Sequence, residues 1–287
     1  MADRSFAQRL PGGLFAATLA ASLSTVALAT PARANPRPLP FSYQSESLAA
    51  GTGEVEQFLD FSPIRVIDYA SGNPIWYNAT QFQTEIEWGL TDRLEVALYF
   101  TFVPNAGDRV TSVPPLVTGN GSKQRVRYRL ADPGAWPIDV AVYGEIAENE
   151  REIELEAKVI LQRRIGRMRV IANLWAEREL YFGGLREWVL NPTLGATYEF
   201  SPRFHLGVES WLRAEYPADV SGPRAFNLGP HVYAGPAFMF DLGRVWWTTG
   251  MYVRVTDLDR AVQPPQLPAY GDAYGRVWVR TVVGLGF

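Results

Sequence analysis

Apolar and polar residues alternate along most of this chain, and a period of two residues is typical of β-strands with two unlike faces. The last segment shows the pattern most clearly. Its mostly apolar face consists of Val277, Val279, Thr281, Val283, Leu285 and Phe287. Its other face carries arginines and glycines, at Arg276, Arg280, Gly284 and Gly286. A strand of this kind separates an apolar medium from a polar one.

About twelve segments alternate in this way between residue 54 and the end of the chain. They cover residues 54–61, 81–90, 94–102, 125–130, 138–143, 152–159, 168–175, 187–200, 204–213, 226–240, 244–255 and 276–287. Their apolar stripes run to about 9–11 residues, the length that a tilted strand needs to cross hydrocarbon. Strands of soluble proteins are shorter, at about 5–6 residues. A soluble sandwich or lipocalin-like barrel, with its apolar face inward, is the alternative.

The connections between these segments alternate in length. The tight ones are residues 91–93, 165–167, 201–203 and 242–244, with 131–137 nearly as short. The longer ones are 67–78, 103–122, 177–186, 217–223 and 257–273. Short turns at one rim and long loops at the other are typical of outer-membrane barrels, and an even strand count places both termini at the short-turn rim.

Aromatic residues gather where the segments approach the short turns. The set is Trp88, Tyr198, Phe200, Phe204, Phe238, Phe240 and Phe287. Such a belt is typical of a membrane interface. The pattern therefore predicts an all-β fold, a single closed antiparallel up-and-down transmembrane β-barrel of about 12 strands. Pro192, Pro230 and Pro236 fall inside strand segments, where proline deletes a ladder hydrogen bond, so we expect bulges or a locally open wall there.

Composition narrows the functional classes. The chain has 287 residues, 47% of them hydrophobic, and a net charge of -3, which gives no reason to expect a nucleic-acid partner. It has no cysteine, which excludes disulfides, thiolate metal sites and cysteine nucleophiles.

The N-terminus is typical of a signal peptide. Arg4 and Arg9 precede an apolar stretch, and cleavage is expected after Ala34 or, as a second candidate, after Ala29. An uncleaved membrane anchor is the alternative. We therefore expect a signal peptide at 1–34, a periplasmic N-terminal leader at 35–52 and the transmembrane barrel at 53–287. No later segment reaches the roughly 18 uninterrupted apolar residues of a spanning helix, so a membrane-embedded chain must be a barrel.

Charged residues form ladders on the face opposite the apolar one. The acidic ladder is Glu152, Glu154 and Glu156, with Glu85 and Glu87 on another segment, and the basic ladder is Arg125, Arg127 and Arg129. One interpretation is a narrow aqueous pore with acidic and basic walls. The other is an interior filled by ion pairs, which conducts little. Sequence leaves both open.

The first and last strands must pair to close a barrel. If Glu54 lies beside the chain end, Asp60 lies roughly opposite Arg280. We predict a contact between Asp60 and Arg280, or its neighbour Arg276, at this closing pair of strands.

Enzyme and metal chemistry find little support. Neither His205 nor His231 has a serine two residues away, the arrangement of the barrel lipid hydrolases, so no catalytic residue is assigned. Asp257, Asp259 and Asp272 match no known metal-binding loop, so we expect neither a metal nor a cofactor.

The terminal strand ending in Phe287, the alternation and the rhythm of the connections resemble the bacterial outer-membrane β-barrel proteins. Segments 51–56 and 87–95 are also similar to the group named after the MetA pathway of phenol degradation. The resemblance implies that Phe287 is part of an assembly signal. It also implies three partners, namely outer-membrane lipids, the barrel-assembly machinery and small solutes.

The leading expectation is a narrow passive channel for small polar or organic solutes in the outer membrane. A non-conducting barrel that acts through its extracellular loops is the alternative. A lipid-modifying enzyme is the third.

Overall fold

The computed structural model of the protein describes residues 34–67, 74–105, 116–217, 230–256 and 276–287. The predicted signal peptide, apart from Ala34, and the loop acids Asp257, Asp259 and Asp272 lie outside the described residues. No helix in the described part of the chain is long and apolar enough to cross a membrane.

The described residues form thirteen β-strands. These are β1 (Gly53–Ile67), β2 (Pro74–Gly89), β3 (Leu94–Asn105), β4 (Leu116–Arg129), β5 (Asp139–Glu148), β6 (Glu152–Ile165), β7 (Met168–Tyr181), β8 (Arg186–Leu190), β9 (Thr193–Ser201), β10 (Phe204–Pro217), β11 (His231–Asp241), β12 (Val245–Arg254) and β13 (Val277–Gly286). Each predicted segment coincides with one of them or, for 187–200, with two.

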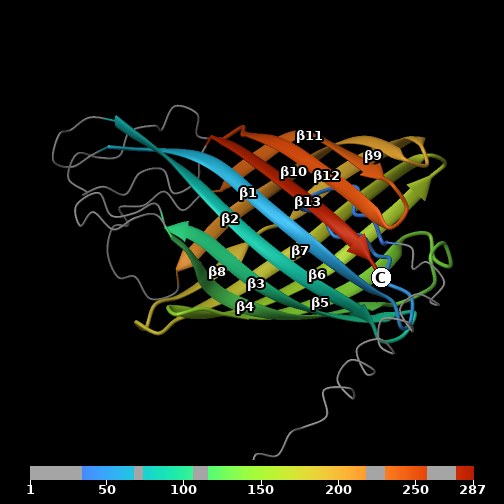
Figure 1. Cartoon of the computed structure of the whole chain (residues 1–287), viewed down its shortest axis with the longest axis horizontal. Helices are drawn as coiled ribbons and strands as arrows, with labels where there is room; N and C mark the ends of the chain where they lie inside the picture. The colour runs from blue at the N-terminus through green and yellow to red at the C-terminus, as the bar shows by residue number, and fades with distance from the viewer. Residues whose placement is uncertain (1–33, 68–73, 106–115, 218–229, 257–275) are drawn as a thin grey trace, which may run out of the picture. The chain divides into compact units, whose positions relative to one another are not determined.

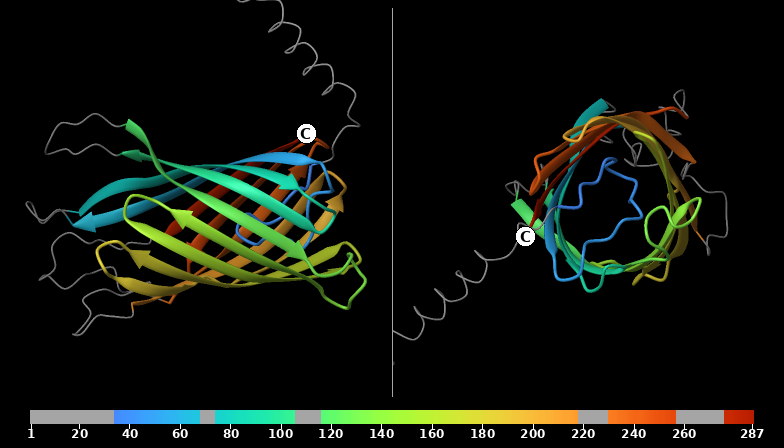
Figure 2. Two further views of the ribbon diagram at one scale, coloured as in Figure 1. Left: turned by 90° about the horizontal axis from the view of Figure 1, so that it is seen from below. Right: turned by 90° about the vertical axis from the view of Figure 1, so that its right-hand side faces the viewer.

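Every strand pairs antiparallel with its neighbours, and β13 pairs with β1 to close the sheet. Strands β8 and β9 both lie between β7 and β10 and are two halves of one crossing. The wall therefore has twelve crossings, which run obliquely around an oval interior (Figures 1 and 2). The predicted closed barrel of about twelve strands is confirmed.

The internal prolines interrupt the wall as expected from their missing N–H group. Pro192 lies in the break between β8 and β9. Pro236 pairs with Val208 on β10, but the β11–β12 register skips Gly235 and Pro236. A Cβ on Gly235 would collide with the carbonyl oxygen of Met251, so glycine is required at this close approach. Pro230 precedes β11 and is not within it.

One predicted long loop is wrong. Residues 177–186 were expected to connect two strands, whereas β7 continues to Tyr181 and only residues 182–185 connect it to β8. The Tyr181 amide donates to the Leu185 carbonyl at 3.0 Å, and Gly184 has a φ of 95°, so the connection is a tight turn. Strands β3 and β4 likewise extend beyond the predicted 102 and 125, into the expected loop.

The barrel carries its apolar residues outside and its charged residues inside. Leu98, Leu155 and Leu174 are 50%, 43% and 58% exposed, whereas Glu85 and Glu95 are fully buried. A soluble barrel has the opposite arrangement, because its apolar face must leave water. The outer surface thus suits a lipid bilayer, and the soluble alternative is excluded.

Aromatic side chains form a chain of contacts along the short-turn end of the wall. Neighbouring ring centroids lie 4.9–5.9 Å apart along the series Tyr198, Phe200, Phe204, Phe240 and Trp247. On the other side of the closing strands, the Trp88 and Phe287 rings lie 6.0 Å apart. With Phe238, whose ring lies 6.0 Å from that of Phe240, these contacts include all seven residues of the predicted belt, and Trp247 in addition.

The largest difference from the sequence prediction concerns residues 34–48, which we call the inner segment. The sequence predicts a periplasmic leader here, but residues 37–45 are buried without a break inside the barrel. Figure 2 shows this segment as a loop within the ring of strands. It has no regular secondary structure, so its hold on the wall depends on side chains.

A charge on the outer face tests the orientation of the wall. We expect Val159→Lys, near the middle of β6, to lower the free energy of unfolding in lipid vesicles by about 2–4 kcal/mol. Ile165→Lys, at the turn end of the same strand, should cost no more than about 1 kcal/mol. Denaturant titration measures both, and equal losses at the two positions would contradict a membrane-facing surface.

Candidate functional site

The inner segment is bound by hydrogen bonds from its backbone to wall side chains. Three prolines, at 36, 38 and 40, have no N–H group and so reduce the number of donors to be satisfied in the lumen. The amides of Asn35, Ser42, Tyr43, Ser45 and Leu48 donate to Glu54, Glu209, Asn173, Gln162 and Glu95 respectively, at 2.6–3.2 Å. The Phe41 amide also donates to Glu209, at 3.3 Å. An irregular backbone is thereby accommodated at membrane depth.

Two aromatic residues of the inner segment pack into the wall. Phe41 stacks on Trp211 at 4.7 Å, and Trp211 in turn stacks on Tyr233 at 4.1 Å. The Tyr43 ring lies 5.2 Å from that of Tyr143, and its hydroxyl lies 3.1 Å from that of Tyr99. These contacts bury apolar area that water would otherwise surround.

Ion pairs neutralise much of the predicted acidic and basic ladders. Arg125 contacts three carboxylates, those of Glu85 at 2.6 Å, Glu95 at 2.7 Å and Glu87. Arg127 binds both oxygens of Glu95 at 2.7 Å. All five side chains are buried, where an unpaired charge is costly. This part of the wall matches the ion-paired interpretation of the interior.

Arg129, the third residue of the basic ladder, lies nearer the short turns than Arg125 and Arg127 do. The Arg129 guanidinium donates to the Asp92 carbonyl at 2.7 Å and lies 3.6 Å from the Asp132 carboxylate.

The acidic ladder of β6 divides between two environments. Glu156 is buried and pairs with Lys158, whose ammonium lies over the Tyr43 and Tyr143 rings at 4.4 and 3.9 Å. Glu152 and Glu154 instead line a cavity toward the rim that carries the long loops. Only these two residues of the predicted triad face open space.

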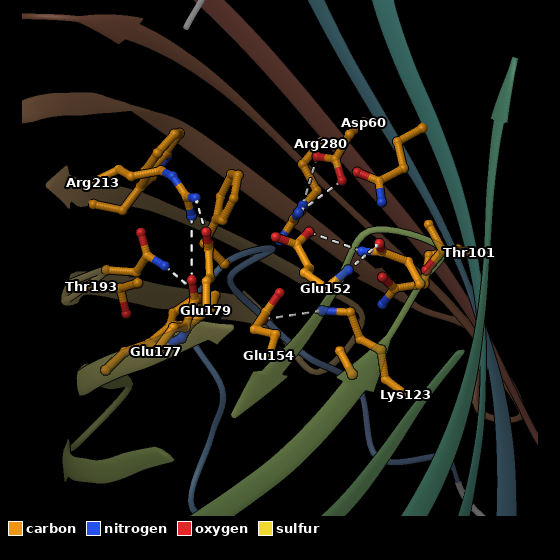
Figure 3. A pocket seen from close by; sticks show the side chains of 18 of the residues that line it. Asp60, Thr101, Lys123, Glu152, Glu154, Glu177, Glu179, Thr193, Arg213 and Arg280 are labelled. Carbon is orange, nitrogen blue, oxygen red and sulfur yellow. Dashed lines mark hydrogen bonds and ion pairs between the residues drawn. The ribbon is translucent and has the colours of Figure 1, made fainter. Parts of the chain in front are cut away.

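This cavity, the loop-side vestibule, has a volume of about 300 Å³ and contains Phe41 in its lining. Figure 3 shows Glu152, Glu154, Glu177 and Glu179 pointing into it. Arg213 bonds Glu177 and Glu179 at 3.4 and 3.3 Å. The described lining carries the carboxylates of Asp60, Glu148, Glu152, Glu154, Glu177 and Glu179 and the cations Lys123, Arg213 and Arg280. Carboxylates outnumber cations, so the potential favours cations.

A second cavity, the turn-side vestibule, has a volume of about 460 Å³. It is lined by Asn35, Pro36, Pro38, Gln44 and Glu46 of the inner segment and, from the wall, by residues that include Arg164, Arg169, Glu199 and His205. The two vestibules share no lining residue. Residues of the buried stretch 37–45 line both of them, Phe41 the loop-side vestibule and Pro38 and Gln44 the turn-side vestibule.

At the closing pair of strands, Asp60 lies directly opposite Arg280 in the β1–β13 register. The Arg280 guanidinium donates two hydrogen bonds to the Asp60 carboxylate, at 2.7 and 2.8 Å, and the Trp278 indole donates a third at 2.8 Å. Of the two predicted partners, Arg280 is the one that binds the Asp60 carboxylate, and Arg276 lies just before β13, where its carbonyl accepts from the Arg254 amide.

The chain end is held by the same pair of strands. The amide of Phe287 donates to the Gly53 carbonyl at 2.8 Å, and the Gly53 amide donates back at 2.9 Å. The Phe287 ring is 42% exposed on the outer face.

Two groups of three carboxylates have ligand atoms within 4.8 Å of one another, Glu56–Glu85–Glu87 and Glu145–Glu154–Glu156. Basic side chains already contact both groups. Arg37 and Arg125 reach the first, and Lys123 and Lys158 reach the second. The arrangement is therefore that of ion-pair clusters.

The inner segment is the part of the site that sequence reasoning missed. One signal could have indicated it, because Leu39, Phe41 and Tyr43 are apolar or aromatic in a stretch otherwise composed as a leader. A second signal is that Arg37 is the only basic residue between the predicted cleavage site and β1.

Comparison with known proteins shows the fold class. No protein-family model matches the sequence, and no curated protein matches it. Among solved structures, the COG4313 outer membrane channel from Pseudomonas putida F1 is similar with a TM-score of 0.55 at 10% identity, covering 85% of this chain and 98% of that one. The NanC porin is similar with a TM-score of 0.51 at 10% identity, covering 81% and 98%.

The protein therefore has the fold of the bacterial outer-membrane β-barrels. Identity of this order establishes the fold alone. The narrower likeness to the phenol-degradation group stays a prediction.

The Asp60–Arg280 pair offers a test of barrel closure. A double-mutant cycle with Asp60→Ala and Arg280→Ala should give a coupling energy of about 1–3 kcal/mol in vesicles, because each single change leaves a charge without its bidentate partner. The exposed Arg93–Asp132 pair is the matched control and should show no measurable coupling. Additive effects at Asp60 and Arg280 would mean that their contact contributes nothing to closure.

Proposed function

We propose that the protein is an outer-membrane channel for small polar or organic solutes, with a lumen that its own inner segment divides. One observation carries this proposal. Within the described residues, the charged lumen contains a cavity toward each rim, and the inner segment, which has no regular secondary structure, contributes to the lining of both. Movement of the inner segment would join the two vestibules without changing any strand pairing.

The composition of the wall supports a preference for cations. The loop-side vestibule has six carboxylates and three cations in its described lining. A charged constriction attracts counter-ions and raises their local concentration. Small cations and polar solutes are therefore the proposed cargo.

A non-conducting barrel is the second candidate, and a specific observation favours it. The inner segment is held by hydrogen bonds from six of its backbone amides to wall side chains and by aromatic packing, which together can keep the lumen closed. In that case the protein would act through its loops.

The proposal includes the route to the membrane. We propose export with a signal peptide, residence in the outer membrane, contact with its lipids and recognition by the barrel-assembly machinery through the strand that ends in Phe287. The exposed Phe287 ring at the closing pair of strands supports the last point.

Conductance separates the two candidates. In planar bilayers we expect the mature protein to open rarely, and a variant that lacks residues 35–48 to conduct steadily with a preference for cations. Circular dichroism and heat-dependent migration on a gel check that the shortened barrel folds. If the folded deletion variant gives no current above leak, the barrel is non-conducting.

Selectivity tests the role of the vestibule within the same experiment. In the deletion variant, Glu152→Gln with Glu154→Gln should lower the cation-to-anion permeability ratio, because both side chains line the loop-side vestibule. Glu199→Gln is the matched control, because it removes a carboxylate of the turn-side vestibule and leaves the loop-side vestibule unchanged.

The mature N-terminus is a separate prediction. We expect cleavage after Ala34, because the backbone nitrogen of Asn35 lies 2.7 Å from the buried Glu54 carboxylate. Cleavage there would convert this amide to an ammonium group and its hydrogen bond to an ion pair. Intact-mass analysis of outer-membrane protein measures the site, and a chain that begins after Ala29 would contradict the prediction.

A further inference from the structure

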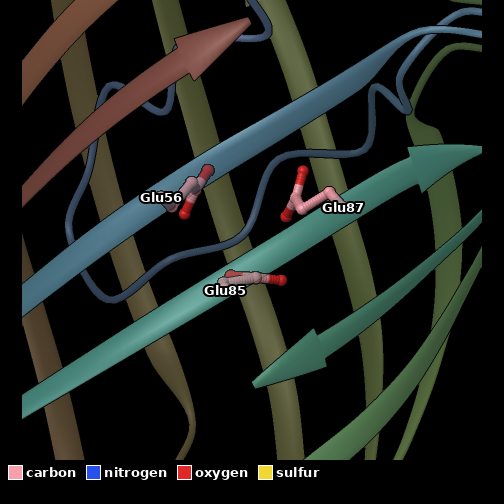
Figure 4. Close-up of side chains that lie close together, drawn as sticks. All are labelled: Glu56, Glu85 and Glu87. Atoms are coloured by element: carbon pink, nitrogen blue, oxygen red, sulfur yellow. The ribbon is translucent and has the colours of Figure 1, made fainter. Parts of the chain in front are cut away.

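The wall carries a compact group of carboxylates beside the inner segment. Figure 4 shows Glu56 on β1 and Glu85 and Glu87 on the neighbouring β2, close to one another. Their ligand oxygens lie within 4.8 Å of one another, and all three side chains are buried. Like charges at this distance repel strongly unless a cation lies between them.

Arg125 of the wall binds Glu85 and Glu87, and the guanidinium of Arg37 reaches all three carboxylates from the inner segment. Its Nη2 lies 2.7 Å from Glu56, 3.6 Å from Glu85 and 3.8 Å from Glu87. Its central carbon lies 4.0 Å from the ring centre of Tyr43 and 5.2 Å from that of Phe58. Carboxylates on one side and aromatic rings on another are the usual surroundings of a bound organic cation.

Without Arg37, the negative charge around Glu56, Glu85 and Glu87 would exceed the positive charge that the wall contributes. In this region, β1–β3 contribute the carboxylates of Glu54, Glu56, Glu85, Glu87 and Glu95. Two arginines of β4, Arg125 and Arg127, reach Glu85, Glu87 and Glu95. Glu56 has its closest ion-pair partner in Arg37, which is the only basic residue of the inner segment.

Arg37 also leaves bonding capacity unused, since its buried Nη1 has no hydrogen-bond partner among the described residues. A free ligand with the same head group could orient to satisfy that donor. The Arg37 guanidinium therefore fits between Glu56, Glu85 and Glu87 but leaves one of its donors without an acceptor.

We propose that Glu56, Glu85 and Glu87, with Phe58, form a binding site for guanidinium and related small organic cations, which Arg37 occupies while the lumen is divided. Solutes of this class compete with Arg37, take over its ion pairs and release the inner segment. This inference rests on the proposed channel function and adds to it a solute class and a means of opening.

Release depends on Arg37 because the other contacts of the inner segment near the constriction are of a different kind. The amides of Ser42, Tyr43 and Ser45 are neutral donors, and their acceptors are Glu209, Asn173 and Gln162. Phe41 and Tyr43 likewise contribute neutral rings, so Arg37 is the only basic side chain that the inner segment contributes. A soluble cation cannot take the place of these neutral groups. It competes with Arg37, because there the carboxylates of the wall bind a cationic side chain of the inner segment.

Cysteine labelling measures release directly, because the chain contains no natural cysteine. Ser45→Cys places a thiol at a fully buried position of the inner segment, and Ala50→Cys provides an exposed control. The mature barrel in proteoliposomes is treated with a polar maleimide, and the labelling rate at residue 45 reports how often the segment leaves the wall.

We expect Arg37→Ala to raise the labelling rate at residue 45 at least tenfold. With Arg37 present, methylguanidinium at tens of millimolar should raise the rate several-fold above sodium chloride of equal ionic strength. With Arg37→Ala, the rate should be high and insensitive to methylguanidinium. The exposed Arg93→Ala is the matched arginine control and should behave like the parent.

Two outcomes would overturn the inference. One is an unchanged rate with Arg37→Ala, and the other is equal acceleration by methylguanidinium and sodium chloride, which would indicate simple screening. Glu56→Gln, which keeps the side-chain shape, should reduce the methylguanidinium response and provides a second variant if Arg37→Ala does not fold.

The labelling readout does not require conduction. Release without current above leak would refute the channel and leave the cation site standing. If the deletion variant conducts but methylguanidinium does not change the labelling rate of the mature barrel, the cation site is refuted and the channel function stands.

Discussion

Charge compensation inside the barrel is the constraint on which the rest of the structure depends. A transmembrane wall must place its polar residues inward, and this wall places many glutamates there. Buried carboxylates are tolerated only with cations or donors close by. Arg125 and Arg127 satisfy part of this demand from the wall, and Arg37 meets more of it from a segment that is not part of the wall. The inner segment is thus an electrostatic component of the barrel as well as an obstruction in it.

The same constraint explains how an irregular segment can reside at membrane depth. Its amides would each cost free energy if buried without acceptors. Prolines remove some of these donors, and Glu54, Glu95 and Glu209 accept from others with carboxylates that themselves need donors. Wall and segment therefore satisfy one another. The buried amides of the segment would lose their acceptors if these glutamates were replaced by apolar residues.

Much of the fold could be predicted from sequence, because the membrane imposes a period of two on every strand. The register at the closing strands followed from the position of Glu54 near the chain end, and Asp60 lies opposite Arg280 as predicted. Strand ends were harder, since the continuation of β7 to Tyr181 depends on a tight turn at Gly184 that alternation does not reveal.

The inner segment could not be read from periodicity at all. Several of its contacts join residues more than 100 positions apart, such as Ser45 with Gln162 and Tyr43 with Asn173, and no local pattern encodes them. For the same reason, the triad Glu152, Glu154 and Glu156 looks uniform in sequence but is divided in space, because Tyr43 and Lys158 close off the last member.

The balance of forces on the inner segment decides between a closed and a conducting barrel. Aromatic packing at Phe41 and Tyr43 and the neutral hydrogen bonds favour closure under all conditions, since neither depends strongly on solutes. The Arg37 contact differs, because its strength depends on what other cations are present and how concentrated they are. A segment held only by packing would be a permanent plug. In our proposal, the charge of the inner segment is also the counter-ion of Glu56, Glu85 and Glu87, and small organic cations displace it. Opening would then depend on these three carboxylates, while the carboxylates of the loop-side vestibule would set the preference for cations.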